Sequence, residues 1–232
     1  KSSDLVMQMV QSAGGTLWNE EGMPFFVGNE IMLKSIETYK ELFETGVMAT
    51  TNSWDEYVST FTTGKTCGVI NGCWIMASIE TAEDTAGNWR VTNMPKLTGL
   101  DGATNYSNQG GSSWGITSNC SNLELAQDFL SATFAGSVEL YETILPGCGA
   151  LSTWIPAADS DVYSEPQDFY GGQPVYESIT QFAANVIPFD TGIYYVEANN
   201  ALATALTNIC AGGDLEFELQ NAEETIKFDM GM

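Results

Sequence analysis

The residues available for chemistry are carboxylates, hydroxyls, thiols and aromatic rings, because the 232-residue chain contains no histidine. Without an imidazole, Ser-His-Asp and Cys-His activation of a nucleophile and the commonest zinc sites are excluded. The 30 Asp and Glu residues allow a pair of carboxylates that hydrolyses glycosidic bonds, but no motif singles out such a pair. The residue types therefore single out no catalytic residue, no metal site and no cofactor.

Trp74 is the leading candidate for a ligand contact. It follows the segment 67–70, which is short, apolar and β-branched at two positions, and is therefore predicted to be a buried strand of an α/β sheet. Asn71 and Gly72 end that strand. Ligands of open α/β sheets bind just beyond the carboxyl ends of strands, where Trp74 lies. The alternative is that Trp74, at the start of a helix, belongs to the core.

A helix precedes this segment. Ser53 and Glu56 have the spacing of a capping box, and apolar residues continue on one helical face, so a helix is predicted from near Trp54 to about Thr63. Gly64 supplies the backbone freedom that a helix exit favours. The helix and the strand together position Trp74.

Helical spacing of apolar residues predicts further helices over 5–13, 30–45, 74–80, 122–130, 138–144, 175–185, 195–211 and 215–226. Asn29 and Asp214 are predicted caps, and Ser121 with Glu124 is a second capping box. A small hairpin is expected over 16–27, a strand over 89–92, and another strand beginning at the glycines of 110–117. Glycine at a strand start allows the backbone to approach another group closely.

The charge balance restricts the partners. A formal net charge of -23, from 30 acidic and 7 basic residues, disfavours nucleic acid and anionic membranes, which are bound by clustered Lys and Arg. Hydrophobic residues make up 44% of the chain, as in a folded protein. The sequence contains no run of 18 apolar residues, which is about the length that a membrane-spanning helix needs.

Several motifs also occur in a fixed order. They are Ala13-Gly14-Gly15 with its acidic hairpin, the helix ending at Gly46, Phe61-x-x-Gly64-Lys65 with Ile70-Asn71-Gly72-Cys73-Trp74, Met94-Pro95-Lys96, Gly110-Gly111-Ser112, Asn122-Leu123-Glu124-Leu125-Ala126-x-x-Phe129-Leu130, and Pro188 to Tyr195 followed by two helices. In this order, over nearly all of the chain, they resemble the family-1 extracellular solute-binding proteins of ABC importers, of the sugar- and maltodextrin-binding type.

The resemblance implies an α/β fold of the periplasmic-binding-protein type (type II), represented mostly by its carboxyl-terminal lobe, helix-rich around a small mixed sheet. Residues 1–106 and 152–232 would form that lobe, and 107–151 would return to an amino-terminal lobe that is largely missing from this fragment, together with its signal segment. The implied protein is a monomer that captures a sugar between two closing lobes and is not an enzyme. It is extracellular, lipid-anchored or periplasmic, and docks on ABC permease subunits in the membrane.

The resemblance also implies the ligand contacts. Trp74 and Tyr194 would stack on sugar rings, whereas Tyr195 would point into its lobe. Gly110, Gly111 and Ser112 would offer backbone amides and a hydroxyl to sugar hydroxyls, and a glycine-loosened strand start is the alternative. Asn71 and Asp190 would bind hydroxyls, although either could cap a turn instead. Trp18 is expected to be structural.

Two other functions remain open. One is a glycoside hydrolase that acts through paired carboxylates. The other keeps the binding fold but takes a cation such as a polyamine, which an acidic cleft lined by aromatic rings also suits.

Overall fold

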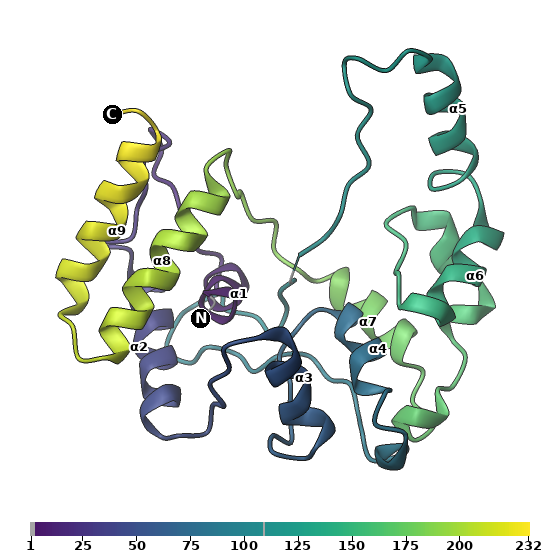
Figure 1. The fold of residues 1–232 in the computed structure, drawn as a ribbon, viewed down its shortest axis with the longest axis horizontal. Coiled ribbons are helices and arrows are strands. Elements are labelled where there is room, and N and C mark those ends of the chain that lie inside the picture. The colour runs from purple at the N-terminus through teal and green to yellow at the C-terminus, as the bar shows by residue number, and fades with distance from the viewer. Residues whose placement is uncertain (1–2, 109) are drawn as a thin grey trace. The chain divides into compact units, whose positions relative to one another are not determined.

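The computed structural model describes residues 3–108 and 110–232, and helices dominate this part of the chain (Figure 1). The α-helices are α1 (Asp4–Ser12), α2 (Glu30–Glu44), α3 (Trp54–Thr62), α4 (Met76–Ile79), α5 (Leu123–Ala132), α6 (Val138–Cys148), α7 (Val175–Ala183), α8 (Tyr195–Cys210) and α9 (Leu215–Asp229). Short 3-10 helices cover Cys73–Ile75, Glu83–Thr85, Ile155–Asp159, Asp161–Tyr163 and Asp168–Tyr170. Every helix predicted from apolar spacing is present. No described helix is long and apolar enough to cross a membrane.

The chain divides into two compact units. The first unit contains 1–60, 94–109 and 186–232, and the second contains 61–93 and 110–185. The chain therefore passes from one unit to the other after positions 60, 93, 109 and 185. The predicted assignment of 1–106, 107–151 and 152–232 to family lobes stays a prediction.

The first unit is built on α1, α2, α8 and α9, and α8 and α9 lie side by side (Figure 1). Its core contains side chains from all four helices that are fully buried, among them Val10, Ile36, Leu202 and Ile226. Two of these helices begin at the predicted caps. The side chain of Asn29 accepts a hydrogen bond from Met32 N at 3.1 Å, and that of Asp214 accepts one from Phe217 N at 2.9 Å.

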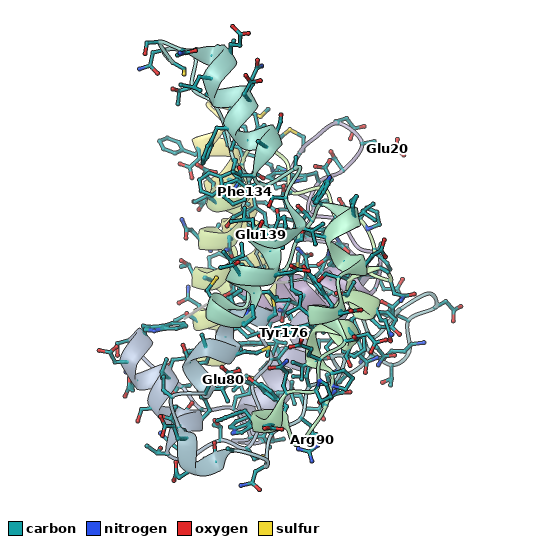
Figure 2. The ribbon with its side chains drawn as sticks, turned by 90° about the vertical axis from the view of Figure 1, so that its right-hand side faces the viewer. Glu20, Glu80, Arg90, Phe134, Glu139 and Tyr176 are labelled. Carbon is teal, nitrogen blue, oxygen red and sulfur yellow. The ribbon has the colours of Figure 1, made fainter. Side chains whose placement is uncertain are left out.

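The second unit has a smaller core that is rich in tyrosine. Its buried members are Met76, Leu145, Tyr163, Tyr170, Val175 and Tyr176. Figure 2 labels Tyr176, which comes from α7, and Glu80, which follows α4. Burial raises the pKa of the Tyr176 hydroxyl, and the nearby carboxylate of Glu80 raises it further.

The predicted strands are the main correction. None of the described residues forms a strand over 67–70, 89–92 or 110–117, and the small mixed sheet is not found. Within the first of these segments Cys67 and Gly68 are exposed and Ile70 is 47% exposed. A strand requires a neighbour that pairs with its backbone, and apolar β-branched residues identify an extended segment without identifying that neighbour. No described segment pairs with 67–70.

The predicted hairpin over 16–27 is present in a minimal form. An isolated antiparallel bridge joins Trp18 and Pro24, and Phe25 N donates to Leu17 O at 2.8 Å. The acidic turn between them is held by Asn19, whose side-chain oxygen accepts hydrogen bonds from the backbone of Glu21 and Met23.

The two capping boxes differ in detail from their predictions. At α3, Ser53 Oγ accepts from Glu56 N at 3.2 Å as expected, but the Glu56 carboxylate accepts from Asn52 N at 2.7 Å, one residue before the expected donor. At α5 the cap is Asn122 and not Ser121, because Asn122 Oδ1 accepts from Leu125 N at 3.1 Å. The amide side chain of Asn122 takes the capping role because the helix begins one residue later than Ser121 requires.

Candidate functional site

Trp74 lies at the surface, in the 3-10 turn Cys73–Ile75 that leads into α4. Its side chain is 44% exposed, whereas Ile75, Met76 and Ile79 after it are buried. Cys73 before it packs against the second unit's core, and burial raises the pKa of its thiol. The turn is therefore anchored by its neighbours on both sides, and Trp74 is not a buried core residue.

Gly110, Gly111 and Ser112 are exposed. The two glycines have φ angles of +82° and +132°, which side chains rarely adopt, so the backbone conformation requires glycine here. A Cβ at either position would meet none of the described atoms within 4 Å. The described residues therefore do not pack against the Cα atoms of these two glycines, the glycines allow the chain to turn here, and their contact with a ligand stays a prediction.

The side chains of Asn71 and Asp190 each accept a hydrogen bond from the backbone of a glycine that follows them in the chain. Asn71 Oδ1 accepts from Gly72 N at 2.8 Å, and Asp190 Oδ1 accepts from Gly192 N at 2.9 Å. These are the local turn contacts that short polar side chains commonly make. The exposed Asp190 carboxylate has a second oxygen, Oδ2, and a carboxylate accepts several hydrogen bonds at once.

Tyr194 and Tyr195 lie at the amino-terminal end of α8, which begins at Tyr195. Tyr194 occupies the position before the first helical residue, and both side chains are half-buried and pack against the core of the first unit. Burial raises the pKa of Tyr195, and the charge of Asp4 adds to this effect. The helix thus fixes the backbone of Tyr194 beside the turn formed by Asp190 and Gly192.

Trp18 is structural, as expected, and it also supports this turn. Its side chain is 9% exposed, and its indole N–H donates to the carbonyl oxygen of Thr191 at 3.0 Å. Gly192 has φ +63° and lies so close to the indole that an added Cβ would be 2.6 Å from Trp18 Nε1. This contact could not be predicted from local patterns, because Trp18 and Thr191 lie 173 positions apart.

The candidate residues fall into two groups. Trp74, Asn71, Gly110, Gly111 and Ser112 belong to the second unit, and Asp190 and Tyr194 belong to the first. Within the first unit, Asp190 and Tyr194 flank a single turn. Among the described residues, no group of three or more Cys, Asp or Glu side chains is arranged to hold a metal ion.

A family model supports the resemblance. Residues 2–162 match the model of the bacterial extracellular solute-binding proteins. A relative from Rhizobium radiobacter, named lactose-binding protein, is 30% identical over 220 residues, which cover 95% of this chain and 52% of the relative. The chain thus spans about half the length of this curated relative.

Solved structures show the same fold over their aligned parts. A binding protein associated with an ABC transporter from B. animalis subsp. lactis, solved with beta-1,6-galactobiose, has a TM-score of 0.74 at 18% identity, over 99% of this chain and 59% of that one. MalX from Streptococcus pneumoniae, solved with maltopentaose, has a TM-score of 0.74 at 18% identity, over 98% of this chain and 59% of that one. The chain therefore belongs to the family of bacterial extracellular solute-binding proteins.

Proposed function

We propose that this chain is part of the substrate-binding component of an ABC transporter and captures a carbohydrate, either an oligosaccharide or a monosaccharide, without doing chemistry on it. The observation that carries the proposal is the 44% exposure of Trp74 in a turn whose flanking residues are anchored in the core. An indole presented in this way covers the apolar C–H face of a sugar ring at a low cost in side-chain entropy. The relative named lactose-binding protein and the two similar structures solved with beta-1,6-galactobiose and maltopentaose support the same class of ligand.

The other candidate residues would add contacts of two kinds. Tyr194 offers a second ring for stacking, held at the start of α8. Asp190 Oδ2, the backbone amides of Gly110 and Gly111, and the hydroxyl of Ser112 offer hydrogen bonds to sugar hydroxyls. Asn71 would contribute through its amide group while its Oδ1 holds the turn at Gly72. In this proposal the complete protein binds its ligand by closing two lobes over it.

The remaining parts of the proposal concern the location, the partners and the lobes of the protein. The component would work outside the cytoplasm, at the cell surface with a lipid anchor or in the periplasm, and deliver the sugar to permease subunits in the membrane. It would act as a monomer and bind no nucleic acid, in keeping with the net charge of -23. Residues 107–151 would return to the amino-terminal lobe, and 1–106 with 152–232 would form the carboxyl-terminal lobe.

The test is a ligand panel measured by calorimetry and by thermal shift on the intact protein. Lactose, galactobiose, maltodextrins and their monosaccharides form the sugar arm, and putrescine and spermidine form the cation arm. A ligand that binds only the folded state raises the melting temperature, so at least one sugar is expected to raise it. A response to polyamines alone would overturn the proposal, and so would release of reducing sugar from an oligosaccharide.

A further inference from the structure

Two of the five cysteines approach each other within the second unit. All five carry free thiols in the structure. The thiol of Cys73 donates to the carbonyl oxygen of Gly149 at 3.8 Å, and Gly149 is the residue after Cys148. Consecutive Cα atoms are about 3.8 Å apart, so the thiol of Cys73 lies at the peptide next to Cys148. The contact joins positions 76 apart in the sequence, and both positions belong to the second unit.

A shared core holds the surroundings of the two cysteines together. Cys73 packs against the tyrosine-rich core of the second unit, to which Leu145 in the last turn of α6 and Tyr176 of α7 also belong. The hydroxyl of Tyr176, labelled in Figure 2, donates to the carbonyl oxygen of Leu145 at 3.5 Å. Beyond the effects of burial and Glu80, the charges of Cys73 and Cys148 both raise the pKa of Tyr176. Both thiols therefore lie near one buried hydroxyl.

The end of α6 leaves room for the Cys148 side chain to move. Cys148 is the last residue of the helix and is exposed, and its Sγ lies 3.1 Å from the carbonyl oxygen of Ile144 in the same helix. Rotation about the Cα–Cβ bond, which takes nanoseconds or less in exposed side chains, frees Sγ from this oxygen. Pro146 and Gly147 are poor helix formers, so the last turn of α6 adjusts easily.

We propose that Cys73 and Cys148 form a disulfide bond that fastens the turn carrying Trp74 to the end of α6. A disulfide requires Cα atoms about 4.4–6.8 Å apart, and the contact of Cys73 with Gly149 favours such a spacing. In the proposed function the protein works outside the cytoplasm, where disulfides form and persist. Only this physiological setting rests on the proposed function, because the bond itself forms between residues of this chain.

The oxidant is a small disulfide, and oxidised glutathione is the one used in the test. Cys148 reacts first, because it is exposed, whereas Cys73 is half-buried and burial raises the pKa of its thiol. The Cys148 thiolate attacks one sulfur of the oxidant, forms a mixed disulfide and releases one glutathione. The Cys73 thiolate then attacks the Cys148 sulfur and releases the second glutathione. The two electrons lost by the cysteines reduce the oxidant, and their two protons end on the two glutathione thiols.

The competing explanation is that Cys73 serves only as a small apolar residue beside the core and that Cys148 is an ordinary surface thiol. Oxidised glutathione would then leave Cys148 as a mixed disulfide and Cys73 as a thiol. The mass of the protein separates the two explanations. An internal disulfide lowers the mass by two hydrogen atoms, whereas a mixed disulfide raises it by one bound glutathione.

The test incubates the intact, fully reduced protein with oxidised glutathione, blocks the remaining thiols by alkylation and maps the cysteines by mass spectrometry. Cys67→Ser is used beside wild type, because Cys67 lies six positions before Cys73 and otherwise shares its peptide. Cleavage after Lys, Arg and Glu, except before proline, then isolates Cys73 in 66–80 and Cys148 in 143–177. The expected result is a cross-linked pair of these two peptides in most of the molecules.

Two variants check that the cross-link is specific. Cys148→Ser is expected to abolish it, and this change at an exposed helix end is tolerated by the fold even where Cys73→Ser is not. Cys120→Ser is the matched control from the same unit and is expected to keep the cross-link. Folded wild-type protein without a bond between Cys73 and Cys148, or with Cys148 bonded to a different cysteine, would overturn the proposal.

The melting temperature is the second readout. Cys73 and Cys148 lie 75 positions apart, and a bond that closes so long a loop lowers the entropy of the unfolded chain. Oxidation is therefore expected to raise the melting temperature of wild type by about 5 °C or more and to leave that of Cys148→Ser unchanged. An unchanged or lower melting temperature of the cross-linked protein would show that the bond does not fit the native fold. Neither readout needs a sugar, so both decide the proposal even if the proposed function fails.

Discussion

The indole N–H of Trp18 donates a hydrogen bond to the carbonyl oxygen of Thr191 at 3.0 Å, and the α-carbon of Gly192 lies against the same indole. This contact joins the small hairpin near the beginning of the chain to the loop that precedes Tyr194. The position of Asp190 and Tyr194 therefore depends on a tryptophan that is itself no ligand candidate.

Gly192→Ala is expected to destabilise the protein by roughly 2 kcal/mol or more, because it adds left-handed backbone strain and a clash with the indole. Gly22→Ala is the matched control, since Gly22 also has positive φ but has open space around its Cα. That control is expected to cost about 1 kcal/mol. Urea denaturation followed by tryptophan fluorescence measures both, and equal losses would refute the packing of Gly192 on Trp18.

Trp74→Ala is expected to weaken sugar binding by on the order of tenfold, or about 1.4 kcal/mol, while changing stability little. The reason is that Trp74 is largely at the surface, so its removal leaves the core intact. Calorimetry with the sugar found in the ligand panel measures the effect. Trp54→Ala is the control, because Trp54 is 50% exposed but lies in α3 against Tyr57. Equal effects of the two substitutions would contradict a specific role for Trp74.

Asn29→Ala is expected to cost more stability than Asp214→Ala, although both residues cap a helix. Loss of a cap costs about 1 kcal/mol in each case. Asn29 additionally donates from Nδ2 to the carbonyl oxygens of Thr16 and Phe25, both at 2.9 Å, and it is 5% exposed. Its removal leaves these acceptors without their donor, which adds about 1 kcal/mol or more. Thermal denaturation of the two variants gives the comparison, and the same loss in both would disagree with it.

Tyr170→Phe is expected to leave the free energy of unfolding at pH 7 unchanged or to raise it by up to about 1 kcal/mol. The hydroxyl of Tyr170 is buried, with 1% of the residue exposed, and makes no hydrogen bond of normal length to the described residues. Tyr163→Phe is the matched change, and it is expected to cost about 1 kcal/mol, because the Tyr163 hydroxyl accepts from Ser152 N at 3.1 Å. If Tyr170→Phe lowered the free energy of unfolding more than Tyr163→Phe does, the conclusion that the Tyr163 hydroxyl has a stabilising hydrogen bond and the Tyr170 hydroxyl has none would be wrong.

Stability is expected to fall as the pH rises above about 10, the usual pKa of tyrosine in an unfolded chain. Burial raises the pKa values of Tyr163, Tyr170 and Tyr176, with the charge of Glu80 acting further on the last two. Below pH 10 these hydroxyls are protonated in both the folded and the unfolded state, so the stability of the fold does not depend on their ionisation. Above it the unfolded state releases protons that the folded state retains, so unfolding becomes easier.

Absorbance at 295 nm during an alkaline titration, together with melting temperatures at each pH, measures this effect. The buried tyrosines are expected to ionise only as the protein unfolds, and Tyr170→Phe should make the melting temperature less sensitive to pH above 10. Ionisation of all nine tyrosines near pH 10 in the folded protein would contradict the prediction that the buried tyrosines ionise only on unfolding.

The helices were predictable because their signals are local. Asn29 and Asp214 cap α2 and α9 through side chains that bond three residues ahead, and Gly64, with φ +73°, follows the end of α3 at Thr62. These contacts depend on neighbours within one turn of the chain. The shift of the α5 cap from Ser121 to Asn122 shows that even local patterns fix a boundary only to within a residue.

The strand predicted over 67–70 is absent, because strand pairing depends on a distant segment that a local pattern does not identify. The candidate site was also only partly predictable from the sequence. Residue type and order identified Trp74, Tyr194 and Asp190 as candidates, and the anchored turn around Trp74 keeps that residue at the surface. The turn contacts of Asn71 and Asp190 were recognised from sequence as one of two possibilities, and both are made.

Patterns in the amino-acid sequence were enough to predict the order of the helices, most of their ends and the family to which the motifs belong, since each of these depends on residues that are close together or in a fixed order. The folded structure was needed to find that Trp18 supports the turn before Tyr194 and that Gln11 bonds to Ser107, Asn108 and Ile187. Such contacts join residues 96 to 176 positions apart, and they exist only because the packed core brings those segments within hydrogen-bonding distance.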